Sequence, residues 1–338
     1  MVAKKPIPTI KKRITSYLNR RPHRSLRRTR RRDYVRQLNL PGYFAFTKHV
    51  NRTFWDNRKI FISLAIVYAV ITVFLVGIAS QDNYTILTNT LKTTSGDIFG
   101  GFWGNIGSAS LMFLTAITGG LSATLTDVQQ IYAGIITLLT WLTTIWLLRN
   151  TLAGHKVKLR DGLYNAGSPI LSTFLVALLL IVQMLPLALA FIGYSAATTT
   201  GLLAGGVEAM LFWISAGLLA ALSTYWMTST FFALVIVTLP GMYPFQAIKT
   251  AGDLVIGRRL RILLRLIWMA VSVFLVWAIT LIPIIIFDTW LKGLWTAINW
   301  LPIVPITLLA LSSLTIVWVS SYVYLLYRKV VADDTNPA

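Results

Sequence analysis

A group of basic residues in the last third of the chain has the composition of an anion-binding site. Positions 258, 261 and 265 are spaced by three and four residues, so on a helix their side chains share one face. Such a face attracts anionic lipid headgroups, with each charge contributing about 1 kcal/mol near a membrane surface. The same charges also act as a topology signal. We expect an anionic-lipid contact at Lys249, Arg258, Arg259, Arg261 and Arg265.

Residue types that carry enzymatic or metal chemistry are scarce. The chain has no cysteine, which excludes disulfides, thiolate nucleophiles and cysteine-ligated zinc or iron–sulfur centres. The three histidines, His23, His49 and His155, are too far apart to form the short-spaced pair of a helix-borne metal site. No glycine-rich phosphate loop is present. The sequence therefore predicts no catalytic residue, no metal and no cofactor, and hence a protein that is not an enzyme.

Few polar residues fall inside the apolar segments, where they are functional candidates by default. Glu208 begins one such segment and favours a helix N-terminus. Asp288 ends another segment, and we expect it to face water. Gln183 lies well inside a segment, where a hydrogen bond between helices is the expected role.

The elements that must position these residues are membrane-spanning helices. Hydrophobic residues make up 56% of the 338 residues and charged residues only 12%, against roughly 25% charged in soluble domains. The apolar residues form blocks of the length that crosses a bilayer, about 20 residues, and such blocks are helical because lipid leaves no other partner for the backbone. We predict an all-α polytopic membrane protein with six spans, at about 60–79, 131–148, 170–194, 208–239, 266–287 and 302–327.

Charge placement predicts the orientation of the spans. With six spans and the N-terminus inside, the cytoplasmic stretches are 1–59, 149–168, 240–265 and 328–338, and they hold 29 of the 31 Lys and Arg residues. This is the positive-inside pattern. We expect a multi-pass protein of the bacterial cytoplasmic membrane with both termini in the cytoplasm. Its parts are a disordered basic arm at 1–39, a membrane domain at 40–330 and a short tail at 331–338.

The segment 98–121 is apolar enough to suggest a seventh span. A span there would invert the downstream topology, and its six glycines disfavour a helix by about 1 kcal/mol each. We expect it to lie on the outer face as a re-entrant or an interfacial element, two alternatives that the sequence leaves open.

The chain also contains an internal repeat. Leu40-Pro41-Gly42 matches Leu239-Pro240-Gly241, and Arg58 matches Arg258 after a slip of one residue. The segment from Lys158 follows the same plan more loosely. We expect three hairpin pseudo-repeats, each entered through a basic amphipathic lead-in helix that lies in the headgroup region.

Two basic motifs carry a resemblance. The stretch from Arg21-Pro22-His23-Arg24-Ser25 through Leu40-Pro41-Gly42-Tyr43, together with Gly257-Arg258-Arg259-Leu260-Arg261, resembles uncharacterised six-span membrane proteins of candidate-phylum bacteria such as the Saccharibacteria. That resemblance covers most of the chain and implies no activity. The plan of a lead-in helix and a span is more distantly similar to the membrane domain of bacterial glycerophosphodiester phosphodiesterases, whose catalytic domain has no counterpart here.

Three functions remain open on these grounds. The favoured one is a non-enzymatic membrane component that organises lipids or proteins from a basic cytoplasmic face. The alternatives are a transporter or permease for a small or lipid-like substrate, and an anchor whose basic arm binds RNA or the ribosome. The expected partners are anionic membrane lipids first, then proteins in the membrane, then nucleic acid, since arginine-rich segments bind both polyanions.

Overall fold

The computed structural model describes residues 40–76, 127–295 and 301–335, and nearly all of this part of the chain is helical. Six helices are long and apolar enough to cross a membrane. They are Arg58–Leu75 (α4), Asp127–Leu152 (α7), Ile170–Thr199 (α9), Gly206–Ile236 (α10), Arg259–Leu294 (α12) and Ile303–Thr335 (α13). The described residues contain no strand. The expected all-α polytopic membrane fold is therefore confirmed.

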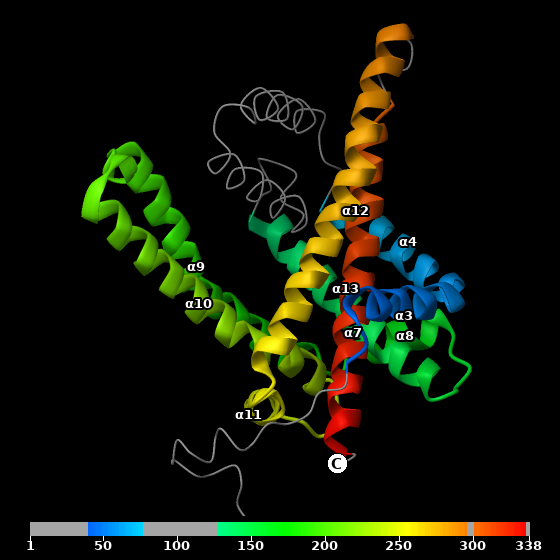
Figure 1. Ribbon diagram of the computed structural model, residues 1–338. Coiled ribbons are helices and arrows are strands. Elements are labelled where there is room, and N and C mark those ends of the chain that lie inside the picture. The colour runs from blue at the N-terminus through cyan, green and yellow to red at the C-terminus, as the bar shows by residue number, and fades with distance from the viewer. Residues whose placement is uncertain (1–39, 77–126, 296–300, 336–338) are drawn as a thin grey trace, which may run out of the picture.

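A short helix precedes the first long helix of each pair. These lead-in helices are α3 (Tyr43–Asp56) before α4, α8 (Leu159–Ala166) before α9, and α11 (Pro244–Val255) before α12. Within the pairs, α4 contacts α7, α9 packs along α10, and α12 packs along α13 (Figure 1). The described chain thus has the expected plan of three hairpins, each with a lead-in helix.

The lead-in helices bury one narrow face each, which is why they lie against the bundle. In α3 the buried residues are Phe46 and Val50, and in α11 they are Ala247, Ala251 and Val255. This spacing of four residues places the apolar side chains on one stripe of a helix. The remaining faces are largely exposed, and they carry polar and basic residues together with exposed aromatic rings such as Phe44, Trp55 and Phe245.

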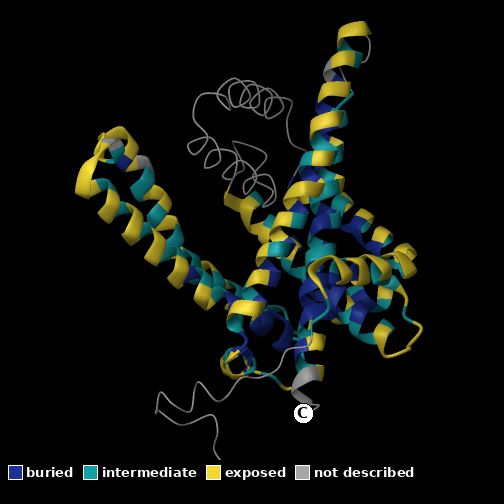
Figure 2. Cartoon of the chain, in the orientation of Figure 1, coloured by how far each residue is buried: buried dark blue, intermediate teal, exposed yellow. Residues whose placement is uncertain are grey.

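The core lies where α4, α7 and α13 meet the last turns of α10, next to the lead-in helices. It is the region with the most buried residues in Figure 2. The Tyr68 hydroxyl of α4 and the Thr143 hydroxyl of α7 are hydrogen-bonded at 2.8 Å. The ring of Phe46 meets the ring of Tyr322 edge-on, with centroids 4.9 Å apart, and so joins α3 to α13.

The hairpin of α9 and α10 projects away from this core, and its surface is largely exposed (Figures 1 and 2). Its two helices are joined by polar bonds across their contact. The Thr230 hydroxyl donates to Oε1 of Gln183 at 2.7 Å, and the Ser223 hydroxyl donates to the Gln183 carbonyl at 2.6 Å. The interhelical hydrogen bond expected for Gln183 is confirmed. The apolar side chains on the outside of the hairpin suit contact with lipid tails.

The largest change from the predicted bounds is in the fifth span. We predicted 266–287, whereas α12 has 36 residues, or about 54 Å at 1.5 Å per residue. Hydrophobicity marks the part of a helix that suits the hydrocarbon layer of about 30 Å. The helix itself continues through the arginines at its start and the charged residues near its end, because these residue types are acceptable in a helix.

The other bounds differ by a few residues. The helix α7 extends beyond the predicted 131–148 at both ends, α9 continues to Thr199, and α4 lies at 58–75 rather than 60–79. The helix α10 ends at Ile236, three residues before the predicted end. Pro240 follows and has no N–H with which to continue the hydrogen bonds of the helix. The helix α13 continues to Thr335, so residues 331–335, expected in the tail, extend this helix.

Three of the expectations fall outside the described residues. They are the basic arm at 1–39, the re-entrant or interfacial element at 98–121, and the last residues of the tail at 336–338.

Candidate functional site

The basic residues of the described chain gather at one end of the fold. With the exception of Lys292, every described Lys and Arg lies in or beside a lead-in helix, or at the adjoining end of a long helix. We call this the basic end. The tip of the α9–α10 hairpin and the end of α12 lie at the other end (Figure 1).

Arg265, one of the five predicted lipid contacts, points into the basic end. Its side chain is buried, and its Nη2 donates to the Pro41 carbonyl. The guanidinium lies 4.2 Å from the centre of the Tyr43 ring, a cation–π distance. Nearby, the indole N–H of Trp268 donates to the Thr47 hydroxyl at 3.0 Å. Arg265 therefore joins α12 to the start of α3.

Arg258 is also buried, at the residue just before α12. Its Nη1 donates to the Val330 carbonyl near the end of α13, at 3.1 Å. Positions 258, 261 and 265 were expected to share one face. Arg258 and Arg265 do share a face, together with the buried Ile262, Leu266 and Met269, whereas Arg261 is exposed. The shared face is the one that packs against the protein.

The other three predicted contacts lie further out. Lys249 on α11 and Arg261 on α12 are exposed. Arg259 is half-buried against α10, where its guanidinium lies 3.8 Å from the centre of the Tyr225 ring and its Nη1 donates to the Tyr225 carbonyl at 3.4 Å. The five residues therefore form no single cluster. Lys249, Arg259 and Arg261 are the ones positioned near the surface.

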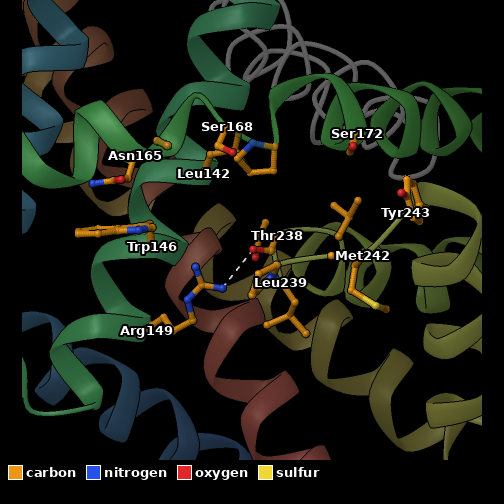
Figure 3. A pocket seen from close by; sticks show the side chains of 15 residues that line it. Leu142, Trp146, Arg149, Asn165, Ser168, Ser172, Thr238, Leu239, Met242 and Tyr243 are labelled. Atoms are coloured by element: carbon orange, nitrogen blue, oxygen red, sulfur yellow. Dashed lines mark hydrogen bonds between the residues drawn. The ribbon is translucent and has the colours of Figure 1, made fainter.

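A cavity of about 460 Å³ with a mixed polar and apolar lining lies at the basic end, and none of these five residues lines it. Three parts of the chain form its wall: the end of α7, the connection from α8 to α9, and the turn between α10 and α11 (Figure 3). Its lining includes Leu142, Trp146, Arg149, Asn165, Ser168, Ser172, Thr238, Leu239, Met242 and Tyr243.

Arg149 provides the positive charge of this cavity. Its Nη1 donates to the Thr238 carbonyl at 3.1 Å, a bond drawn in Figure 3. Asn165 also lines the cavity and holds α8 together by donating from Nδ2 to the Asp161 carbonyl at 2.7 Å. The arrangement combines a cation, an amide and hydroxyl groups. These are donors, and donors at an open surface suit an anion.

Local sequence explains how the cavity walls are shaped. The α10–α11 turn contains Gly241 at φ +77°, a left-handed conformation that favours glycine. The same turn is closed by the Met242 N–H, which donates to the Leu239 carbonyl at 3.2 Å. Across the cavity, Pro169 stands at the start of α9, and its fixed φ limits how the connection from α8 enters the helix.

The sequence did not predict this cavity. In the sequence, Arg149 stands out only as one of the basic residues that orient the spans. The lining residues lie up to about a hundred positions apart, so no local spacing connects them. The repeated Leu-Pro-Gly motif is the sequence feature that marks the position of this cavity, because Leu239, Pro240 and Gly241 all line it.

A second, mostly apolar cavity of about 300 Å³ lies between α3, α12 and α13. Its polar margin includes Asn51, whose Oδ1 accepts from the Trp318 indole N–H at 2.7 Å. At its wall the Trp277 indole N–H donates to the Thr315 hydroxyl at 2.9 Å. The polar groups that line it are therefore largely bonded to one another.

Asp288 differs from its expected position in water. It is fully buried within α12, and its Oδ2 forms an ion pair with Nζ of Lys292 at 2.8 Å. The helix continues past the predicted span, so a neighbour one turn later covers the carboxylate. In the ranges that the structure describes, no group of three or more His, Asp or Glu side chains is placed to hold a metal ion.

Comparison of the chain with protein-family models, with curated proteins and with solved structures gave no match.

Proposed function

We propose that the protein is a non-enzymatic component of the bacterial cytoplasmic membrane, which binds anionic lipids at its basic end and organises lipids or partner proteins there. One observation carries the proposal: the basic residues of the described helices gather at the end where all three lead-in helices lie. By the positive-inside rule this end faces the cytoplasm, where the leaflet carries anionic lipids.

The surface of the lead-in helices supports a position at headgroup depth. On α3, Phe44 and Trp55 are exposed, and the Arg58 guanidinium lies 5.3 Å from the centre of the Trp55 ring. Aromatic rings beside basic groups are typical of the interface between headgroups and acyl chains. On the third repeat, the exposed charges of Lys249 and Arg261 are available to phosphates in the same layer.

The test is to identify the lipids that copurify with the full-length protein in mild detergent, by mass spectrometry. The protein should be enriched in anionic phosphatidylglycerol over neutral phosphatidylcholine when both are supplied. Removing two surface charges in K249Q/R261Q should weaken that preference by about 2 kcal/mol, or roughly thirtyfold in affinity. The matched variant K249R/R261K keeps both charges and should retain the lipid.

Two results would count against the proposal. The first is a K249Q/R261Q protein that retains as much anionic lipid as the wild type. The second is copurification of RNA in place of lipid, which would favour the nucleic-acid anchor instead.

A further inference from the structure

We infer that the cavity between α7, the α8–α9 connection and the α10–α11 turn binds a phosphate group, either in an anionic lipid headgroup or as free phosphate, with Arg149 as its cationic anchor. This inference rests on the proposed function and deepens it, because it assigns phosphate recognition to one cavity rather than to diffuse surface charge.

The first argument is the charge of Arg149. Its side chain is half-buried, and no described carboxylate forms an ion pair with it. One N–H is used by the Thr238 carbonyl, whereas a guanidinium has five N–H donors in a planar fork. The remaining donors suit the paired oxygens of a phosphate. A cation that is partly removed from water and lacks an acid partner favours the binding of an external anion.

The second argument is the pair of hydroxyls opposite. Ser168 and Ser172 both line the cavity, and Figure 3 shows them on the side that the α8–α9 connection contributes. Neither hydroxyl is bonded to another described residue. By contrast, the hydroxyl of Thr173, which does not line the cavity, donates to the Pro169 carbonyl at 2.8 Å. The two serines therefore retain donors for a ligand. Ser172 also lies in the first turn of α9, where the helix dipole favours negative charge.

The third argument comes from the internal repeat. Both Leu-Pro-Gly turns have an arginine from another hairpin bonded to a nearby carbonyl: Arg265 at the first turn and Arg149 at the second. At the first turn the rings of Tyr43 and Phe46 lie close to the guanidinium, at 4.2 and 5.9 Å, and Phe46 is fully buried.

The second turn lacks this aromatic cover. A shift of 199 residues places Met242 and Phe245 at the positions of Tyr43 and Phe46. Met242 lines the cavity, and Phe245 is 81% exposed instead of buried. The arginine at the first Leu-Pro-Gly turn is thus covered by aromatic rings, whereas the arginine at the second turn is open to a ligand.

The size and lining of the cavity fit a headgroup. Its volume of about 460 Å³ falls within the range of ligand pockets, about 300–1,000 Å³. Arg149 and the two serines line part of the wall, while Leu142, Leu239 and Met242 contribute apolar surface. A phosphate joined to a less polar glycerol backbone matches the polar part and the apolar part of this wall.

The experiment uses full-length protein in phosphatidylcholine nanodiscs, and two ligands are titrated separately. One arm adds phosphatidylglycerol and the other adds inorganic phosphate, and binding is followed by native mass spectrometry and ³¹P NMR. We expect R149Q to weaken binding about tenfold or more, as for a charged hydrogen bond. The matched control K156Q removes an exposed charge from the connection between α7 and α8, outside the cavity, and should change binding less than twofold.

A second variant separates binding from folding. S168A/S172A removes no hydrogen bond within the described protein, so its Tm should equal that of the wild type while its affinity falls severalfold. Phosphatidylglycerol binding that inorganic phosphate does not displace identifies the lipid as the source. Displacement at low phosphate concentration identifies free phosphate instead.

The inference is overturned if R149Q and S168A/S172A bind both ligands like the wild type, or if K156Q weakens binding as much as R149Q. In that case the broader proposal still stands provided that K249Q/R261Q loses its lipid preference. The opposite pattern, with loss in R149Q and full preference in K249Q/R261Q, retains the cavity and contradicts a lipid contact at the exposed residues Lys249 and Arg261.

Discussion

Long basic and aromatic side chains hold the lead-in helix α3 in place. The Arg265 side chain reaches an acceptor 224 positions away in the chain, and the Trp318 indole reaches one 267 positions away. Each joins α12 or α13 to α3. A charge can remain buried in this way because a carbonyl and an aromatic face replace part of its hydration.

Replacing Arg265 with methionine tests this contribution. R265M keeps the length of the side chain but leaves the Pro41 carbonyl without its donor. We expect a loss of about 1–3 kcal/mol in unfolding free energy, measured by thermal unfolding in neutral detergent with tryptophan fluorescence.

The matched control is R261M, because Arg261 lies four residues earlier on the same helix and is exposed. Its effect should stay within about 0.5 kcal/mol. Equal Tm values for the two variants would mean that Arg265 does not hold α3 to the bundle.

At the scale of elements, the close approach of α8 to α7 shapes the wall that carries Arg149. Gly162 of α8 is buried against α7, and a Cβ added there would lie 2.9 Å from Leu147 and 3.3 Å from Thr143. Leu147 is itself fully buried and has little room to move. The absence of a side chain at residue 162 therefore sets the distance between the two helices.

We predict that G162A destabilises the protein by about 1–3 kcal/mol, because overpacking forces a core side chain or the helix to shift. The control is G134A, on an exposed part of α7 where an added Cβ meets nothing within 4 Å. That change should be neutral or stabilise the helix by up to about 1 kcal/mol. Chemical or thermal unfolding of both variants gives the comparison, and a G162A protein as stable as G134A would refute the packing argument.

At the scale of the whole molecule, three repeats of one plan place every lead-in helix at the same end. The outer part of the projecting α9–α10 hairpin carries few of the buried residues, whereas α4, α7, α13 and the last turns of α10 carry most of them (Figure 2). The basic end is thus both the best-packed part of the fold and the part with nearly all the described positive charge. A surface of this kind is suited to a fixed orientation in a membrane.

Single-cysteine labelling tests that orientation without background, since the native chain has no cysteine. His155 and Thr250 are exposed at the basic end, and Leu202 is exposed at the tip of the α9–α10 hairpin. In intact cells, a membrane-impermeant maleimide should label L202C but neither H155C nor T250C until the membrane is opened. Labelling of H155C from outside would reverse the proposed orientation.

The amino-acid sequence was enough to predict the helical class, the six spans, the repeat and a bond of Gln183 between helices. These features depend on hydropathy, length and local spacing, and a lipid environment leaves the backbone of an apolar block no choice but a helix. It also determined that Arg258 and Arg265 share a face, which follows from helix periodicity alone.

Contacts in the folded chain set which way that face turns and which arginine remains open. Arg258 and Arg265 are buried because Val330 and Pro41, 72 and 224 positions away, supply their acceptors. Arg149 remains open to a cavity because Met242 and Phe245 do not cover it. Spacing places side chains on a common face of a helix, but the solvent, lipid or protein that this face meets is set by contacts between segments that are distant in the chain.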